Sequence, residues 1–287
     1  MTKAKKLREM LNSGKLIMAP GAYDVWSAKM IQEAGFEAVY MTGYGVSASV
    51  IGKPDIGIMT FTEVATMAHN MAMAIDVPLI ADCDTGFGNA LNVMRCVQEF
   101  ETAGVAAIQL EDQLMPKRCG HMEGKVLIPM DDMVAKIRAA VAARKDPDFV
   151  IIARTDARAV YGLDEAISRA KAYVEAGADV IFLEAPQSVE EVKTVAETLK
   201  IPLLSNMVEK GKTPLFSREE LQEMGYSIVI YPVTALYAAT KHVMETLKVL
   251  KDSGRIAETV PYCCDFPTFN KMINLAELRA LEKSFSE

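Results

Sequence analysis

Acidic side chains follow several short apolar runs of the sequence, at the points where these runs end. Asp82 and Asp84 come directly after one run, inside Asp82-Cys83-Asp84-Thr85-Gly86-Phe87-Gly88, and Glu111 follows the next run along the chain. Carboxylates that converge in a protein interior are costly to bury without a cation. Their oxygen donors suit Mg²⁺, or alternatively Mn²⁺, better than zinc. The pattern therefore predicts a divalent-cation site, unless the acids only cap helices or pair with Lys and Arg.

A second cluster of reactive residue types is Lys117-Arg118-Cys119-Gly120-His121, which follows Pro116. Neighbouring Lys and Arg side chains favour a thiolate and lower the pKa of a cysteine. Such a cysteine can act as a nucleophile or as a proton donor. We expect a mobile lid that closes over an anionic substrate and excludes water. The alternative is an ordinary solvated basic loop with an incidental cysteine.

Short apolar runs, each followed by a helical pattern, recur along the whole chain. They are Leu16-Ala19, Ala38-Met41, Leu79-Ala81, Ala106-Leu110, Val150-Ala153, Val180-Leu183, Leu203-Leu204 and Ile228-Tyr231. The runs are continuous rather than alternating, which is typical of parallel strands buried on both faces. Three Ala-Gly turns, at Gly35, Gly104 and Gly177, separate helices from strands and indicate repeated units.

These repeats predict an α/β fold, a (β/α)8 TIM barrel. The alternative, an open doubly wound sheet, usually has a glycine-rich nucleotide turn after its first strand, and Pro20-Gly21-Ala22-Tyr23-Asp24 is not one. In a barrel the reacting groups lie at the carboxyl ends of the strands. The polar residues Thr42, Arg154, Glu184 and Asn206 occur at such ends too.

The C-terminal part has a helical pattern but no strand. We expect a barrel domain over residues 1–253, closed by a helix at Thr234–Asp252, and a helical tail over residues 254–287 with one helix at Phe266–Phe285. An extra helix without a strand either caps its own barrel or exchanges with a neighbouring subunit.

Composition excludes some classes of function. The net charge of −7 argues against a nucleic-acid partner, whose binders carry basic patches, but not against an anionic substrate. The chain has no apolar run long enough to span a bilayer and no targeting segment, so no membrane partner is expected. Its 5 cysteines lack metal-like spacing, which favours a reduced, cytoplasmic location.

The acid motif and the lysine-arginine-cysteine-glycine-histidine loop together resemble the isocitrate lyase and phosphoenolpyruvate mutase superfamily. The similarity extends to Ala153-Arg154-Thr155-Asp156, Leu183-Glu184-Ala185-Pro186 and Ser205-Asn206-Met207. The cysteine loop is specific to the lyase branch, and the short chain resembles its methylisocitrate and 2,3-dimethylmalate lyases.

The resemblance implies a magnesium-dependent carbon–carbon lyase. Such an enzyme cleaves a 2-hydroxy di- or tricarboxylate to pyruvate and a carboxylic acid, and the family implies a homotetramer. The implied metal residues are Asp82, Asp84, Glu111 and Asp55, largely through water. The implied substrate-binding residues are Thr42, Gly43, Tyr44, Arg154, Glu184 and Asn206. The implied catalytic residues are Cys119 as general acid, Lys117 and His121 beside it, Arg154 as a cation for the leaving fragment, and Tyr40 for the hydroxyl proton.

Two departures from methylisocitrate lyases bear on the substrate. Met122-Glu123-Gly124-Lys125 replaces Arg-Pro-Asn-Lys, and Thr42-Gly43-Tyr44-Gly45 replaces Ser-Gly-Gly-Gly. Tyr44 adds bulk beside the implied carboxylate site, which favours a smaller acid such as dimethylmalate. An oxaloacetate hydrolase or decarboxylase on the same metal site stays open. A phosphonate mutase, which generally lacks the cysteine, and a non-catalytic binding barrel are further alternatives.

Overall fold

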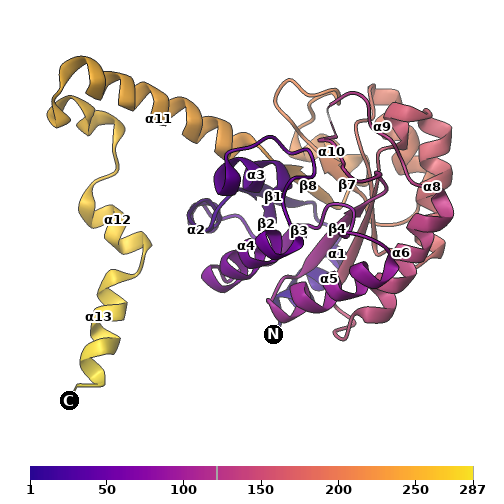
Figure 1. Cartoon of the computed structure of the whole chain (residues 1–287), viewed down its shortest axis with the longest axis horizontal. Coiled ribbons are helices and arrows are strands. Elements are labelled where there is room, and N and C mark those ends of the chain that lie inside the picture. The colour runs from indigo at the N-terminus through magenta and orange to yellow at the C-terminus, as the bar shows by residue number, and fades with distance from the viewer. Residues whose placement is uncertain (121, 287) are drawn as a thin grey trace. The chain divides into compact units, whose positions relative to one another are not determined.

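The computed structural model describes residues 1–120 and 122–286, and the chain divides into two compact units, residues 1–235 and 236–287. The first unit is built around a single parallel sheet (Figure 1). Its strands are β1 (Ile17–Ala22), β2 (Val39–Met41), β3 (Leu79–Asp82), β4 (Ala107–Glu111), β5 (Val150–Thr155), β6 (Val180–Leu183), β7 (Leu204–Asn206) and β8 (Ile228–Tyr231).

The 8 strands lie in the order β6-β5-β4-β3-β2-β1-β8-β7. A parallel bridge between Ile181 and Leu203 joins the two ends of this sheet, β6 and β7. The sheet is therefore a nearly closed barrel, and the predicted (β/α)8 class is confirmed over an open doubly wound sheet. Every expected run coincides with a strand to within a few residues.

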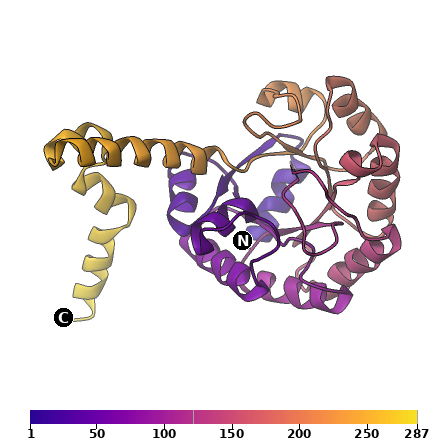
Figure 2. The ribbon, with the colours of Figure 1, turned by 45° about the horizontal axis from the view of Figure 1, so that its top comes forward.

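Helices follow the strands and surround the barrel as an outer ring (Figure 2). The helices after β1 to β7 are α2 (Val25–Glu33), α3 (Gly43–Ile51), α4 (Phe61–Ala74), α5 (Ala90–Thr102), α6 (Met130–Ala143), α7 (Ala157–Val160), α8 (Leu163–Glu175), α9 (Val189–Thr198) and α10 (Arg218–Glu223), whereas α1 (Lys3–Asn12) precedes β1 and packs against the barrel interior. The predicted Ala-Gly turns lie where helices end. Gly35, Gly104 and Gly177 have φ of +89°, +82° and +104°, a conformation that glycine adopts without steric cost.

Alternate residues of each strand face opposite sides of the barrel wall. In β5, Val150 and Ile152 belong to one apolar cluster, and the residues that alternate with them, Ile151 and Ala153, belong to another. The first cluster fills the barrel interior and includes Leu7 and Leu11 of α1, whereas the second packs the wall against the outer helices. This burial on both faces explains why the strands are continuous apolar runs in the sequence.

The second unit consists of most of α11 (Thr234–Ser253), the 3-10 helix η1 (Ile256–Tyr262), α12 (Phe266–Met272) and α13 (Leu275–Ser284). The α-helices α11, α12 and α13 bury none of their residues. The expectation of one helix at Phe266–Phe285 was wrong, because Asn274 has φ of +56°, a left-handed conformation that separates α12 from α13. The predicted domain boundary at 253/254 stays a prediction. Among the described helices, none has the length and apolar character to cross a membrane.

Candidate active site

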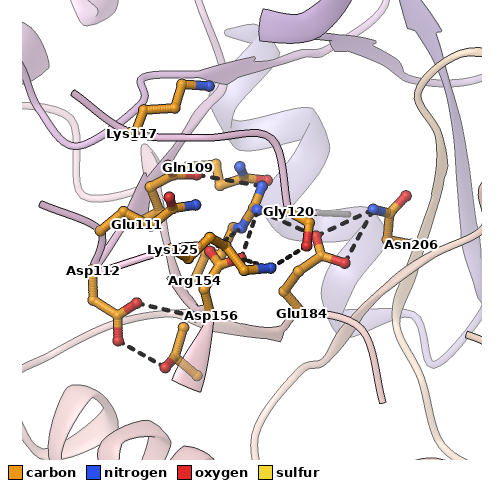
Figure 3. A network of polar contacts seen from close by, with 12 residues as sticks. Gln109, Glu111, Asp112, Lys117, Gly120, Lys125, Arg154, Asp156, Glu184 and Asn206 are labelled. Atoms are coloured by element: carbon orange, nitrogen blue, oxygen red, sulfur yellow. Dashed lines mark hydrogen bonds and ion pairs between the residues drawn. The ribbon is translucent and has the colours of Figure 1, made fainter. Parts of the chain in front are cut away.

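Buried polar side chains gather at the carboxyl ends of the barrel strands (Figure 3). Nearly all the predicted metal and substrate residues belong to this group. The buried members are Tyr40, Thr42, Asp55, Asp82, Asp84, Glu111, Lys117, Arg154, Glu184 and Asn206. Gly43, Tyr44 and Cys119 are half-buried. His121, which the sequence also predicts, lies outside the described residues.

Lys117 lies inside the acid cluster rather than at the protein surface. Its Nζ is 2.6 Å from Asp55 Oδ1 and 2.7 Å from Asp84 Oδ1, and its side chain is only 2% exposed. Burial alone would lower the pKa of Lys117, but the surrounding carboxylates, Asp84 and Glu111 foremost, outweigh it and raise the pKa well above its usual value. The loop between β4 and α6, which is the lid expected from the sequence, therefore contributes a permanent cation to the acids.

The remaining acids of the cluster are only partly compensated. Desolvation by burial, and then the neighbouring charge of Asp84, raise the pKa of Asp82 to about 6. Desolvation raises the pKa of Glu111 well above its usual range despite the opposing effect of Arg154. Glu111 Oε2 is 3.4 Å from Arg154 Nη1, and its Oε1 accepts no hydrogen bond from the described residues. The cluster is thus short of positive charge.

These residues fit a hard divalent cation. All the donors are carboxylate oxygens, and the uncompensated oxygen of Glu111 and the raised pKa of Asp82 are relieved by added positive charge. Within residues 1–120 and 122–286, no three His, Cys, Asp or Glu side chains lie close enough to hold a metal together. Mg²⁺ tolerates this, because it keeps several waters in its coordination shell.

Arg154, at the end of β5, is surrounded by carboxylates. Its Nε and Nη2 donate to Asp156 at 2.9 and 3.1 Å, a two-pronged contact that fixes the plane of the guanidinium group. Glu184 Oε2 is 3.5 Å from Nη2, and the guanidinium carbon lies 5.1 Å from the ring centre of Phe182. The cation is therefore held rigidly at the mouth of the barrel.

Glu184 and Asn206 form the next part of the site. Asn206 Nδ2 donates to Glu184 Oε2 at 3.2 Å, which links the ends of β7 and β6 (Figure 3). Arg154, Glu184 and Asn206 thus form a continuous row of hydrogen-bonding groups. The row and the Lys117 cluster contain different residues, and the two meet where Arg154 lies beside Glu111.

The segment after β2 brings a helix end to the acids. Thr42 is the N-cap of α3 and accepts from Gly45 N at 3.4 Å, so Gly43 and Tyr44 occupy the first turn. A Cβ atom on Gly43 would lie 2.7 Å from Asp82 Oδ2, which explains the need for glycine. Backbone amides at a helix N-terminus are suited to binding an anion. The predicted carboxylate-binding residues therefore lie beside the predicted metal residues.

Tyr40 lies below the acids, inside the barrel. Its hydroxyl group donates to Gln109 Oε1 at 3.1 Å and lies 3.4 Å from Asp82 Oδ2. Desolvation and the charge of Asp82 raise the pKa of Tyr40 well above its usual value. The hydroxyl group is therefore protonated at neutral pH.

The loop between β4 and α6 folds over the strand ends. The Gln113 side chain bonds both backbone groups of Arg118, donating to its carbonyl at 2.8 Å and accepting from its amide at 2.9 Å. Antiparallel pairing of Gln113 with Leu127 joins the two arms of the loop. At the tip, a Cβ atom on Gly120 would lie 2.4 Å from Arg154 Nη2. The cysteine loop therefore touches the guanidinium group directly.

Sequence reasoning gave no role to several buried polar residues of this site, namely Gln109, Asp112, Lys125 and Asp156. Gln109 and Asp156 had a detectable signal, because each lies two positions from a predicted site residue and alternate strand residues share a face. Lys125 had none, since nothing local marks one lysine of an exposed-looking loop as buried.

The fold and the site together define a class: a (β/α)8-barrel enzyme with a carboxylate cluster for a cation, an arginine at the barrel mouth and a cysteine-bearing lid. The family model described as phosphoenolpyruvate phosphomutase matches residues 7–251. The chain belongs to this family, within the phosphoenolpyruvate mutase/isocitrate lyase superfamily, as its sequence motifs predict.

Two curated relatives cover almost the whole chain. The 2,3-dimethylmalate lyase of Eubacterium barkeri is 50% identical over 286 residues, covering 100% of this chain and 99% of the relative. The 2-methylisocitrate lyase of Bacillus subtilis strain 168 is 42% identical and covers 99% of this chain and 93% of the relative. The chain is accordingly an enzyme of the carbon–carbon lyases in this superfamily.

Solved structures agree on the fold and extend the range of chemistry. Oxaloacetate acetylhydrolase in complex with the inhibitor 3,3-difluorooxalacetate has a TM-score of 0.94 at 38% identity, covering 99% of this chain and 97% of that one. Phosphonopyruvate hydrolase in complex with oxalate and Mg²⁺ has a TM-score of 0.90 at 34% identity, covering 100% of both chains.

Proposed function

We propose that this enzyme cleaves a 2-hydroxy dicarboxylate of the 2,3-dimethylmalate type into pyruvate and a carboxylic acid, with Mg²⁺ as cofactor and Cys119 as general acid. The observation that supports this most is the close approach of Gly120 to Arg154. A Cβ atom added to Gly120 would lie only 2.4 Å from Arg154 Nη2. This approach brings the neighbour of Cys119 to the cation that would hold the leaving fragment. A proton donor and a carboxylate-binding group therefore meet at one place.

Asp82, Asp84 and Glu111 would hold Mg²⁺, largely through water, and Asp55 would lie in the water shell. A magnesium-bound phosphonopyruvate hydrolase of the same fold supports this assignment. When bound, Mg²⁺ neutralises these acids and stabilises negative charge that develops on the 2-oxygen of the substrate. The amides of Gly43 and Tyr44, with the Thr42 hydroxyl group, would bind the 2-carboxylate at the N-terminus of α3.

Cleavage of the bond between C2 and C3 leaves its electron pair on C3, beside the second carboxylate. Arg154, with Glu184 and Asn206 fixing its surroundings, would hold that carboxylate. The Cys119 thiol would then protonate C3, and a donor placed in this way contributes about 100- to 10,000-fold over bulk water. Lys117 and His121 would tune the thiol.

Tyr40 is our candidate for handling the hydroxyl proton of the substrate. Its protonated hydroxyl group lies 3.4 Å from Asp82 Oδ2, so it could give its own proton to the acid cluster as it accepts the proton of the substrate hydroxyl group.

Tyr44, in the first turn of α3, favours the smaller acid. It stands where methylisocitrate lyases usually have glycine, so it adds bulk to the helix turn whose amides would bind the carboxylate. The 50% identity with a 2,3-dimethylmalate lyase supports the same choice. We therefore expect 2,3-dimethylmalate to be a better substrate than 2-methylisocitrate.

An oxaloacetate hydrolase is the second candidate function, because the oxaloacetate acetylhydrolase structure matches this fold with a TM-score of 0.94. The two functions separate in one assay. Purified protein with Mg²⁺ is incubated with 2,3-dimethylmalate, 2-methylisocitrate, citramalate, isocitrate and oxaloacetate, and the products are identified by chromatography. Pyruvate from a hydroxy acid supports the lyase, whereas acetate with oxalate from oxaloacetate alone contradicts it.

We also propose a cytoplasmic homotetramer whose C-terminal helices exchange between subunits. The support is the apolar surface of α11, on which Tyr237, Val243, Met244 and Leu247 are all exposed. An exposed apolar surface of this kind is typical of a protein–protein contact. Sedimentation equilibrium at micromolar concentration tests this, and a monomer mass would contradict it.

A further inference from the structure

We propose that Lys125 is a positioning residue that holds the Cys119 loop down on the barrel, an inference that rests on the proposed role of Cys119. Lys125 lies on the returning arm of the loop and is 8% exposed. Its Nζ is 3.2 Å from Asp156 Oδ1 and also donates to the Gly120 carbonyl group. One ammonium group therefore ties the tip of the loop to the end of β5.

The anchor for this ammonium group is shared with the substrate cation. Asp156 Oδ1 accepts from Arg154 Nη2 at 3.1 Å and pairs with Lys125, while Asp156 Oδ2 accepts from Arg154 Nε (Figure 3). A single carboxylate thus sets the distance between the lid and the guanidinium group. When the lid is latched, Gly120 is in contact with Arg154, and Cys119 is the next residue along the chain.

The anchor is itself held rigidly from behind. Asp156 N donates to Asp112 Oδ1 at 3.0 Å, and Asp112 Oδ2 accepts from Thr155 Oγ1 at 2.7 Å. Arg169 Nη1 donates both to Asp112 Oδ2 at 3.2 Å and to the Ile128 carbonyl group at 3.0 Å, where the returning arm meets α6. The contact of Lys125 therefore ties the loop to an anchor that is itself fixed by several hydrogen bonds.

A second contact of the same loop provides a comparison. Lys212 pairs with Glu123, whose side chain is 85% exposed. Exposed ion pairs contribute little, whereas a buried charged hydrogen bond is strong because water does not compete for it. Lys117 holds the outgoing arm of the loop, and of the two lysines that contact the remainder, Lys125 and Lys212, only Lys125 makes a buried contact.

Hydrogen–deuterium exchange of the full-length protein without substrate tests the proposal. In Lys125→Met the backbone amides of residues 117–126 are expected to exchange about 10- to 100-fold faster, as loss of a charged hydrogen bond implies. Lys212→Met is the matched control and is expected to exchange like the wild type within about threefold. In turnover assays we expect kcat of Lys125→Met to fall by a factor similar to its loss of protection, with a smaller change in KM.

Unchanged exchange in Lys125→Met, or an equal effect in Lys212→Met, would overturn the latch. If Lys125→Met does not fold, Lys125→Gln, which keeps a donor for Gly120 but no charge for Asp156, is measured in the same way. The exchange result does not depend on the substrate. A protein that shows the predicted exchange but turns over none of the acids would keep the latch and refute the proposed function.

Discussion

Lys117 Nζ lies 2.7 Å from Asp84 Oδ1, so the lid inserts a cation among the carboxylates that we assign to Mg²⁺. Lid position and metal binding are therefore coupled, because the same acids face both positive charges. Opening the lid removes one unit of positive charge from the cluster and leaves Asp55 and Asp84 without their ammonium partner.

The first prediction concerns this coupling. In Lys117→Met the acids lose a positive charge, and we expect Mg²⁺ to bind about tenfold more tightly, since about 1.4 kcal/mol is a modest change for charges a few ångströms apart. Titration calorimetry measures this. Lys53→Met, an exposed lysine on the segment that contains Asp55, is the control and should leave the Mg²⁺ affinity unchanged. Weaker binding in Lys117→Met would show that Lys117 orients the carboxylates instead.

The second prediction concerns pH. Burial, and then Asp84, raise the pKa of Asp82 from 3.8 to about 6, so the folded state binds more protons than the unfolded state between these values. Asp82 therefore destabilises the metal-free protein above about pH 6, and this penalty disappears as the pH falls toward 4.

Thermal unfolding in EDTA measures the effect. We expect Asp82→Asn to be more stable than the wild type at pH 7.5, by no more than about 3 kcal/mol, and to lose this advantage by about pH 4.5. Mg²⁺ should narrow the difference at pH 7.5 by stabilising only the wild type. A stability difference that does not vary with pH would contradict the raised pKa.

Part of this site is predictable from sequence and part is not. The eight strands and the acids at their ends follow from continuous apolar runs that stop at polar residues, a local pattern. Asp55 is different, because it lies on the segment between α3 and α4, and only its 2.6 Å contact with Lys117 places it in the cluster. The sequence suggested it through family resemblance alone.

Residues whose role depends on a long-range contact escaped prediction. Lys125 is buried only because the lid folds onto Asp156, 31 positions later in the numbering, at 3.2 Å. Asn274 separates α12 from α13 although the helical pattern of the sequence runs on across it, because Asn274 adopts a left-handed conformation at φ of +56°. Local patterns predict which elements form, whereas the contacts between distant loops decide which polar residues become buried.

A third prediction tests the approach of the lid to Arg154. In Gly120→Ala the new Cβ atom would lie 2.4 Å from Arg154 Nη2, so the lid must rise by about an ångström or more. We expect kcat/KM to fall about 100-fold or more while the melting temperature stays close to wild type. Steady-state kinetics and a thermal melt decide the matter. Full activity in Gly120→Ala would show that the lid does not work in this position.

The fourth prediction uses two arginines with similar partners. Arg154 makes a two-pronged contact with Asp156 in the site, and Arg158 makes one with Glu191 outside it, at 2.8 and 2.7 Å. Lysine cannot reproduce the planar fork of a guanidinium group. We expect Arg154→Lys to raise KM by about 10- to 100-fold and Arg158→Lys to change it by less than about threefold. Equal kinetic effects of the two substitutions would remove the substrate role of Arg154.

The most direct test of the central claim is the rate of pyruvate release from 2,3-dimethylmalate in the presence of Mg²⁺. We predict that the wild type releases pyruvate and propionate in equal amounts. Cys119→Ser should be about 100- to 10,000-fold slower, while the exposed Cys264→Ser control keeps the wild-type rate. A wild type that leaves 2,3-dimethylmalate intact, or a Cys119→Ser variant as fast as the wild type, would contradict the proposed lyase mechanism.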